Sequence, residues 1–373
     1  MNASSPDDVS RSSAPLSGAP RLVASPYLHF DGWQVVNPLT NVTLTPTDRL
    51  FAPLHELRGG RPVDGAIERE LRAGLWAIPD GEDLSHRFRL KVVSLEAHSV
   101  CNQACYFCPV SVAPREKSFM PTELYERIVA ELSAFRDSIE GVCMNNYNEP
   151  TVDRRFVQQV ATIKAAGLPP AVLSNGSGLT PDRVDALLGL GGLRYLSVNI
   201  STLEKDRYAR DRGVDQLETV VRNIDYMCDK PVAEEMDLVV LGGGDEPHRK
   251  AHREITERYG GSRFHVRPFE ARDRAGWLPN GVRPAEKHRK LRGCDNVGSR
   301  PLEHLHVTAE GKCIFCCEDY DEKLVVGDLK TQSVREVLEG PALALLRRWS
   351  YGVEEAPDDF ICRSCIAART EGE

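Results

Sequence analysis

The sequence predicts an α/β protein whose largest part is a parallel sheet covered by helices. Six apolar, β-rich segments alternate with helical segments between residues 89 and 275. Strands buried on both faces form continuous apolar runs, and strands that alternate with helices favour parallel pairing. Six such units indicate a barrel or part of one, in which chemistry gathers at the carboxyl ends of the strands. Residues before 89 and after 275 lack this alternation, so we expect smaller flanking regions there.

The six predicted strands are runs of apolar residues bounded by polar or turn-forming ones. They are Leu90–Leu95, Gly141–Asn146, Ala171–Asn175, Tyr195–Ile200, Met236–Leu241 and Phe264–Arg267. The helices predicted between them have the apolar spacing of amphipathic helices. They are Thr122–Phe135, Arg155–Ala166, Pro181–Leu188, Gln216–Met227 and Glu246–Tyr259.

Two regions precede this series. Residues 1–26 are polar and of low complexity, and we expect a disordered leader there, with no secretory signal. Residues 27–88 are expected to form a small module of two strands followed by two helices. Its predicted elements are the strands Trp33–Val36 and Val42–Leu44 and the helices Thr47–Leu57 and Asp64–Leu75.

The charge balance excludes some classes of partner. The chain has 55 acidic and 47 basic side chains, and its formal net charge is −8. Nucleic acids and anionic membranes attract basic proteins, so we expect neither as a partner. The apolar runs are far shorter than the roughly 20 residues that span a bilayer, and a cytoplasmic protein is expected.

Residues 276–373 contain six of the 11 cysteines but few apolar segments. A strand is predicted at Leu305–Val307 and a helix at Ser333–Trp349. Clustered cysteines in a chain without an export signal point to metal or redox chemistry rather than to disulfides. We therefore expect a lobe that is held together partly by metal.

The first cysteine group directly follows the first predicted strand. Cys101, Cys105 and Cys108 form a C-x3-C-x2-C motif. Three thiolates on one short loop can bind three irons of a [4Fe–4S] cluster, which normally takes four cysteines. The fourth iron is then open to another ligand, as one position of a catalytic zinc site is. A zinc site at this loop is the alternative.

The eight residues from Cys101 to Cys108 match the signature of the radical S-adenosylmethionine (SAM) superfamily, and residues 89–275 resemble its core domain. The resemblance implies a partial (β/α)6 barrel that binds a [4Fe–4S] cluster with SAM. It also implies that the enzyme cleaves SAM reductively to a 5′-deoxyadenosyl radical, which abstracts a hydrogen atom from the substrate. A reductant such as flavodoxin or ferredoxin is the expected electron donor.

The same resemblance implies SAM contacts at the strand ends. Glu149 lies in the segment Tyr147–Pro150, where the family usually has glycines that are missing here, and would accept a hydrogen bond from the SAM amino group. The alternative for Glu149 is a solvated loop carboxylate, and the alternative for Phe107 is simple packing. For Ser174, Asn175, Asn199 and Ser201 it is capping of a strand end. The other expected contacts are Phe107, beside the adenine, and Asn148, Ser174, Asn175, Asn199 and Ser201. No general base is assigned.

The second cysteine group consists of Cys294, Cys316, Cys362 and Cys365. Their spacing resembles the auxiliary-cluster domain called SPASM or its shorter twitch form, which implies that residues 276–373 bind one auxiliary [4Fe–4S] cluster. Cys313 or Cys317 could replace Cys316 as a ligand. Because four cysteines also suit tetrahedral zinc, a structural zinc site is the alternative.

The substrate is not specified by the radical chemistry. Residues 27–88 resemble the winged-helix-like, PqqD-type modules with which peptide-modifying members hold a precursor peptide, and the strand Trp33–Val36 could accept that peptide at a sheet edge. A ribosomal precursor peptide is therefore the expected substrate. The alternative is oxidation, dehydrogenation or epimerisation of a small natural-product intermediate such as an aminocyclitol, sugar or nucleoside, with Cys313 or Cys317 as hydrogen donor for an epimerase. A non-catalytic iron–sulfur protein is a third hypothesis.

Overall fold

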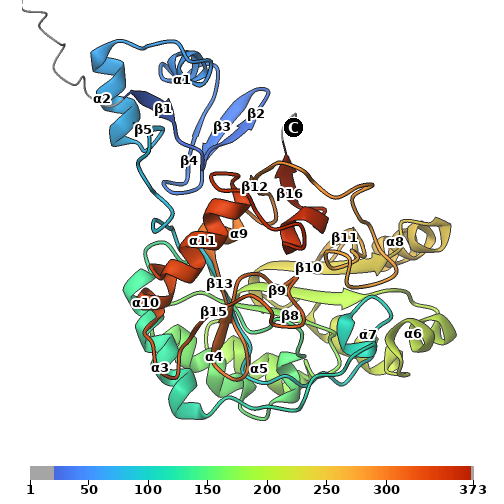
Figure 1. The fold of residues 1–373 in the computed structure, drawn as a ribbon. Helices are drawn as coiled ribbons and strands as arrows, with labels where there is room; N and C mark the ends of the chain where they lie inside the picture. The colour runs from blue at the N-terminus through green and yellow to red at the C-terminus, as the bar shows by residue number, and fades with distance from the viewer. Residues whose placement is uncertain (1–20, 371–373) are drawn as a thin grey trace, which may run out of the picture.

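The six strands that the alternating pattern predicts are all present, as parallel neighbours. They are β6 (Val92–Leu95), β7 (Gly141–Cys143), β8 (Pro170–Ser174), β9 (Leu193–Ile200), β10 (Ala233–Gly242) and β11 (His265–Glu270). Each strand pairs in parallel with the next one along the chain. The strands form a partial (β/α)6 barrel, which fills the lower half of Figure 1.

Helices cover the outer face of this sheet. The predicted ones are α3 (Thr122–Leu132), α4 (Phe156–Ala165), α5 (Pro181–Gly189), α7 (Leu217–Met227) and α8 (Glu246–Tyr259). Their apolar stripes join the strands in one large core, in which Val172, Leu196 and Leu238 are fully buried. Each such side chain contributes roughly 1.5–3 kcal/mol of burial free energy.

One barrel helix was not predicted. The helix α6 (Lys205–Arg212) has the sequence KDRYARDR, whose single large apolar residue, Tyr208, is fully buried. It ends at Gly213, whose φ of 68° is left-handed. Charged residues on most of its positions conceal the helical period that sequence patterns rely on.

The sheet continues past the predicted boundary at residues 275–276. Strand β13 (His304–Val307) pairs in parallel with β6, and the antiparallel strands β14 (Lys312–Ile314) and β15 (Val325–Asp328) follow it. The result is one nine-stranded sheet with the order β11-β10-β9-β8-β7-β6-β13-β14-β15. The C-terminal lobe is thus fixed to the first strand of the barrel.

The helix predicted at Ser333–Trp349 is two helices, and that prediction was wrong. These are α10 (Val334–Leu338), which begins with a capping box at Ser333, and α11 (Pro341–Ser350). Gly340 between them has extended backbone with ψ of 152°, because a residue before proline is disfavoured in the helical region. The lobe also contains β12 (Leu291–Cys294), which pairs with β16 (Ala368–Thr370), and the short helix α9 (Arg300–Glu303).

The N-terminal module begins earlier than residue 27. Strand β1 (Leu22–Ala24) pairs antiparallel with β5 (Ala77–Pro79). The leader predicted over residues 1–26 is therefore wrong from Leu22 onward. The structure, a computed structural model, describes residues 21–370, so residues 1–20 lie outside the described part. Hydrophobic strands of three residues are too short to stand out in a sequence.

The module also has a three-stranded sheet and two helices. The elements are β2 (His29–Asp31), β3 (Gln34–Asn37), β4 (Val42–Leu44), α1 (Phe51–Arg58) and α2 (Gly65–Ala73). The order is β2-β3-β4, so the predicted edge strand Trp33–Val36 corresponds to the central strand β3, and that prediction was wrong. The predicted helix start at Thr47 was also wrong, because Thr45 and Asp48 form a hydrogen-bonded turn before α1.

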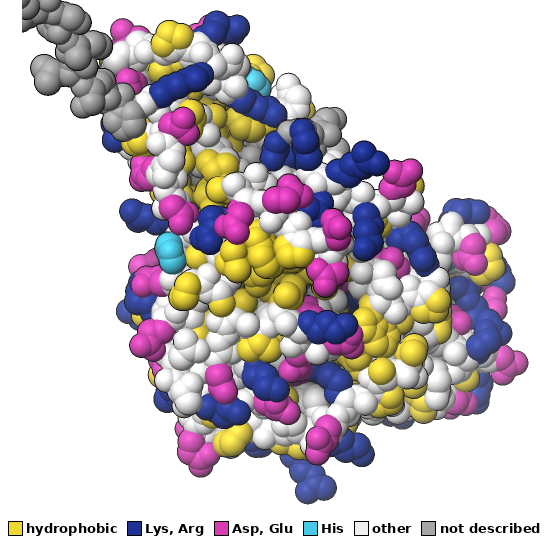
Figure 2. Space-filling model, in the orientation of Figure 1, with side chains coloured by type: hydrophobic (Ala, Val, Ile, Leu, Met, Phe, Trp, Pro, Cys, Tyr) yellow, Lys and Arg dark blue, Asp and Glu magenta, His cyan; other side chains and the backbone are white. Residues whose placement is uncertain are grey.

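The module lies at the top of Figure 1 and packs against the C-terminal lobe, next to β12 and β16. Tyr27 and Tyr351 have ring centroids 4.9 Å apart, and Arg369 forms an ion pair with Asp31. Figure 2 shows hydrophobic side chains gathered just below the module on this face, among interspersed basic and acidic ones. Among the described residues, no helix is long and apolar enough to cross a membrane.

Candidate active site

The first cysteine group lies on the loop after β6, at the carboxyl end of the barrel. The end of α6 supports this loop, since the backbone N–H groups of Ala104 and Tyr106 donate to the carbonyl oxygens of Arg212 and Asp211 at 2.9 and 3.1 Å. Gly213 permits this close approach, because a Cβ atom there would lie 2.9 Å from the Ala104 oxygen. The loop is therefore held by main-chain contacts that leave its cysteine side chains free.

Two thiols of this loop, those of Cys101 and Cys108, have raised pKa values. Burial raises the pKa of Cys101 to about 12, and the neighbouring Cys105 and Cys108 add to that rise. Burial also raises the pKa of Cys108. Thiolates that repel one another in a buried place are stabilised when a cation binds between them. The three cysteines of the motif therefore share one loop, and their role as cluster ligands stays a prediction.

Glu149 joins the end of β7 to the end of β8. Its Oε1 accepts hydrogen bonds from Ser174 Oγ at 2.8 Å and from Thr151, and its Oε2 accepts from the Asn175 N–H at 2.7 Å. Burial raises the pKa of Glu149, while these donors act in the opposite direction. Glu149 and Ser174 are therefore neighbours, as strand order predicts, and much of the carboxylate is already hydrogen-bonded within the protein.

The predicted amides have different surroundings. Asn175 donates to Asn102 Oδ1 at 2.8 Å, and so links β8 to the cysteine loop. Asn148 is buried and donates back to the Met144 carbonyl at 3.3 Å, within its own turn. Asn199 is half-buried near the end of β9. Of these three, only Asn175 bonds directly to the cysteine loop.

Arg212 is a site residue that the sequence analysis missed. It is 2% exposed, its Nε donates to Ser201 Oγ at 3.2 Å, and its Nη1 lies 3.8 Å from Cys105 Sγ. Its guanidinium lies 5.1 Å from the ring centroid of Phe107. Arg212 thus connects three predicted positions, but nothing in its highly charged helix distinguishes it from its neighbours.

One nitrogen of Arg212 supplies a test of cofactor fit. Its Nη2 is buried and has no hydrogen-bond partner in the protein. An unpartnered buried donor is costly, and a charged donor suits an anionic group. The residues at the cysteine loop therefore fit a ligand that carries a carboxylate, as SAM does.

The second cysteine group surrounds a cavity in the C-terminal lobe. Cys294, Cys316, Cys362 and Cys365 all line this cavity. The turn with its 3-10 helix Ile361–Ser364 brings the last two together, and β12 and the loop after β14 supply the others. Four thiols around one cavity fit either a [4Fe–4S] cluster or tetrahedral zinc by number.

The two cysteines left open as alternative ligands differ in position. Cys313 is fully buried in the hydrophobic core, and neither it nor Cys317 is among the described residues that line the cavity. Cys317 lies against the Arg300 guanidinium, whose Nη1 is also 3.9 Å from Cys316 Sγ. The geometry favours Cys316 as the ligand.

The histidines near these groups are buried. Burial lowers the pKa of His306 well below its usual value, and its Nδ1 lies 3.3 Å from Asn146 Oδ1. Its ring nitrogen also comes within 4.8 Å of the sulfurs of Cys316 and Cys317. His98 accepts a hydrogen bond from the Val100 N–H at 3.2 Å and stacks on Phe119. Both side chains are positioned by local contacts.

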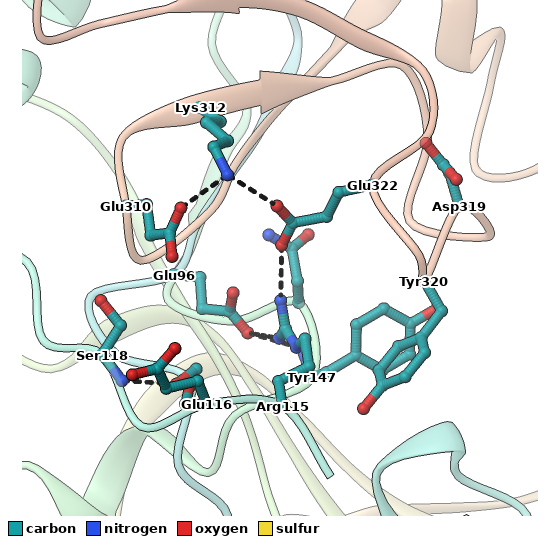
Figure 3. Close-up of polar contacts among 12 residues, drawn as sticks. Glu96, Arg115, Glu116, Ser118, Tyr147, Glu310, Lys312, Asp319, Tyr320 and Glu322 are labelled. Atoms are coloured by element: carbon teal, nitrogen blue, oxygen red, sulfur yellow. Dashed lines mark hydrogen bonds and ion pairs between the residues drawn. The ribbon is translucent and has the colours of Figure 1, made fainter. Parts of the chain in front are cut away.

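A polar network joins the barrel to the C-terminal lobe (Figure 3). Arg115 donates to Glu96 at 2.5 Å and to Glu322 at 3.1 Å. Its guanidinium lies 5.5 Å from the ring centroids of both Tyr147 and Tyr320. Glu96 is fully buried, and burial raises its pKa against the opposing effect of Arg115. Hydrogen bonds and ring contacts of Arg115 therefore link the two lobes.

Comparisons with known families agree with this geometry. Residues 95–254 match the radical SAM superfamily, and residues 294–366 match the iron–sulfur cluster-binding domain named SPASM. The two matches contain the two cysteine groups. The chain contains a radical SAM domain followed by a SPASM domain. The family match confirms the resemblance predicted from the motif, and this radical SAM protein is accordingly an enzyme with a SPASM domain.

Two curated relatives of this radical SAM protein are named for their functions. The SAM-dependent 2-deoxy-scyllo-inosamine dehydrogenase of Niallia circulans is 22% identical over 286 residues, which cover 75% of this chain and 95% of that protein. The tungsten-containing aldehyde ferredoxin oxidoreductase cofactor-modifying protein of Pyrococcus furiosus is 29% identical and covers 30% of this chain and 31% of that protein.

Solved structures show the same fold. SuiB of Streptococcus suis, bound to its precursor peptide SuiA, is 13% identical, with a TM-score of 0.55 over 92% of this chain and 93% of SuiB. Native anSMEcpe with bound AdoMet is 12% identical, with a TM-score of 0.50 over 70% of this chain and 84% of that protein. The SuiB match extends into the N-terminal module, since residues 89–373 make up only about three quarters of the chain.

Proposed function

We propose that this radical SAM enzyme cleaves SAM reductively and abstracts a hydrogen atom from a ribosomal precursor peptide. The observation that carries the first part is the loop of Cys101, Cys105 and Cys108, with the unpartnered Nη2 of Arg212 beside it. When bound, the cluster and SAM supply a 5′-deoxyadenosyl radical. We expect the reductant to be a flavodoxin or ferredoxin in the cytoplasm.

The residues of the chain position SAM in this proposal. Arg212 and Ser201 bind its carboxylate, because the guanidinium has a free donor and the hydroxyl already orients it. Asn175 and the loop residue Asn102 hold the cysteine loop against β8. Glu149 fixes the β8 end by its hydrogen bonds and offers its remaining acceptor capacity to the SAM amino group. The proposed roles of Phe107, Asn148, Ser174 and Asn199 are contacts around these groups.

The C-terminal cavity is proposed to hold one auxiliary [4Fe–4S] cluster on Cys294, Cys316, Cys362 and Cys365. Four cysteines remain, which are Cys143 in β7, Cys228 after α7, Cys313 in β14 and Cys317. The first three come from separate parts of the fold, so the described residues offer no second complete set of four. One auxiliary cluster close to the barrel could accept an electron from the substrate, which suits an oxidation.

The peptide substrate is supported by the N-terminal module. The module packs on the auxiliary lobe, and β4 is an edge strand whose Val42 is 47% exposed. An exposed edge strand can accept an extended peptide by main-chain hydrogen bonding. The structural match to SuiB includes much of this module. We therefore propose residues 21–88 as a winged-helix-like peptide-holding module, with β4 replacing β3 as the docking edge.

The peptide proposal is tested by hydrogen exchange on the reconstituted enzyme. The probe is the peptide encoded by a short reading frame beside the gene, and a scrambled peptide of the same composition is the control. Slower exchange at Val42–Leu44 with the first peptide alone supports docking on β4. Unchanged exchange there would reject it.

A small-molecule substrate is the second candidate. The observation that favours it is the alignment with the Niallia circulans dehydrogenase, which covers 95% of that protein. In this case the enzyme would dehydrogenate or epimerise an aminocyclitol, sugar or nucleoside. Deuterium transfer from labelled 2-deoxy-scyllo-inosamine into 5′-deoxyadenosine would favour it over the peptide.

A further inference from the structure

Arg274 and Glu318 form an ion pair with unused hydrogen-bonding capacity. The Nη1 atom of Arg274 lies 3.4 Å from Oε1 of Glu318. The Nε of Arg274 and the Oε2 of Glu318 are both buried and have no partner. The Glu318 residue is 4% exposed, whereas the Arg274 side chain is 33% exposed. Buried polar atoms without partners are uncommon and call for a ligand or water.

The backbone around Arg274 holds this side chain in place. Arg274 and Ala275 have φ values of 56° and 54°, followed by Gly276 at 87°. Left-handed backbone is disfavoured for residues other than glycine, and such strain is concentrated at functional sites. The turn is closed by the Leu278 N–H, which donates to the Asp273 carbonyl at 2.7 Å. The segment follows β11, at the carboxyl end of the barrel.

The pair lies between the two cysteine groups. Glu318 lines the cavity of the auxiliary cysteines. On the other side, the Arg274 guanidinium is 5.7 Å from the ring centroid of Tyr147, and its positive charge opposes the burial that raises the pKa of Cys108. A substrate held here has a cluster site on each side.

We propose that Arg274 and Glu318 anchor the substrate through a neutral polar group that presents a hydrogen-bond acceptor and a donor side by side. Arg274 Nε–H donates to the acceptor oxygen, and Glu318 Oε2 accepts from the N–H or O–H donor. This assignment rests on the proposed function, because it names the substrate chemistry of that site.

A neutral group fits because the pair carries no net charge. Arginine and carboxylate compensate each other, so a charged ligand would leave one unpaired charge in a largely buried place. A side-chain carboxamide of a peptide and adjacent hydroxyls of a cyclitol or sugar share this chemistry. The test distinguishes a peptide from a cyclitol or sugar by using a separate probe for each.

The test measures probe binding to the reconstituted, SAM-loaded enzyme by ligand-observed NMR. The carboxamide probe is N-acetylasparagine amide and the hydroxyl probe is scyllo-inositol, with N-acetylleucine amide and cyclohexanol as apolar comparators. We expect one polar probe to bind at least tenfold more tightly than its comparator. Arg274→Met and Glu318→Gln should each remove that preference, because each leaves one hydrogen bond of the pair unmade.

Arg272→Met is the matched control, since Arg272 lies two residues away and its guanidinium is 5.5 Å from the Phe269 ring centroid. It should leave the preference intact. Equal binding of polar and apolar probes, or a preference that survives in both anchor variants, overturns the proposal. Loss of auxiliary iron in Glu318→Gln also overturns it, because Glu318 would then serve the cluster. If the wild-type enzyme makes no 5′-deoxyadenosine from SAM, the proposed function itself fails.

Discussion

The Nε2 atom of His29 lies 2.9 Å from the hydroxyl oxygen of Tyr351. This contact joins the N-terminal module to the helix end that precedes Cys362 and Cys365. The same hydroxyl lies 2.6 Å from Ser299 Oγ, five residues after Cys294. The module that we propose to hold the peptide is therefore fixed to the elements that carry the auxiliary cysteines.

Acid should weaken this contact. Burial, followed by the nearby Arg369, lowers the pKa of His29 from 6.5 to about 4, against the opposing effects of Asp295 and Asp31. Because the folded pKa is the lower one, the unfolded state binds the proton first, and stability is lost as pH falls from about 6.5 towards 4. At pH 5 the loss from His29 is about 2 kcal/mol.

The measurement is the thermal unfolding midpoint between pH 7.5 and 5, compared with His29→Gln. The variant should show a shallower loss of stability with acid, because glutamine does not titrate. Parallel pH profiles for the two proteins would contradict this assignment.

Arg212→Lys should weaken SAM binding at least tenfold. Lysine keeps the charge but cannot bond Ser201 and a carboxylate with the same planar geometry. The measurement is the SAM dissociation constant of the reconstituted enzyme, with iron content as a second readout. Arg210→Lys is the control, since the Arg210 side chain is 71% exposed. Normal SAM affinity in Arg212→Lys would refute the proposed carboxylate contact.

Glu149→Gln should lower the free energy of unfolding by about 1–3 kcal/mol. The NH2 group of the new amide would face N–H and O–H groups that donate hydrogen bonds to the carboxylate in the wild-type protein. We expect a lower thermal unfolding midpoint for this variant than for the wild-type protein, measured before any cofactor is added. Glu126→Gln, at an exposed helix position, should have no such effect. Equal midpoints for the variant and the wild-type protein would show that the hydrogen bonds from Ser174 and Asn175 contribute little to the stability of the fold.

Iron content distinguishes the auxiliary ligands. Two [4Fe–4S] clusters give about eight irons per chain. Cys316→Ser should lower this to about four, whereas Cys317→Ser and Cys313→Ser should keep about eight. Loss of about four irons in Cys317→Ser, with about eight kept in Cys316→Ser, would show that Cys317 is the ligand in place of Cys316. Zinc in the C-terminal lobe of the wild-type protein would reject the auxiliary cluster.

Much of the barrel could be predicted because its signals are local. Most of the six strands are hydrophobic runs, although β11 is largely polar and exposed. The Cys101–Cys108 motif needs only eight consecutive residues. The pairing of strands, in contrast, depends on residues far apart in the sequence. Whether β3 is an edge or a central strand depends on β2, a three-residue strand that the sequence does not reveal. The same holds for β13, which joins β6 across more than 200 residues.

The site was predictable to a lesser extent. Cysteines are rare enough to stand out, but Arg212 and Arg274 are two of many basic residues in the chain. Their importance appears only when the fold shows that each has a buried nitrogen without a partner. Asn148 illustrates the converse, since its side chain bonds within its own turn.

The most direct test of the account is the formation of 5′-deoxyadenosine from SAM by anaerobically reconstituted wild-type and Cys105→Ala proteins. We predict that the wild-type protein forms it under reduction. The variant should form none while retaining about four irons of the auxiliary cluster. Undiminished 5′-deoxyadenosine formation by Cys105→Ala would contradict the claim that the three-cysteine loop carries the catalytic cluster.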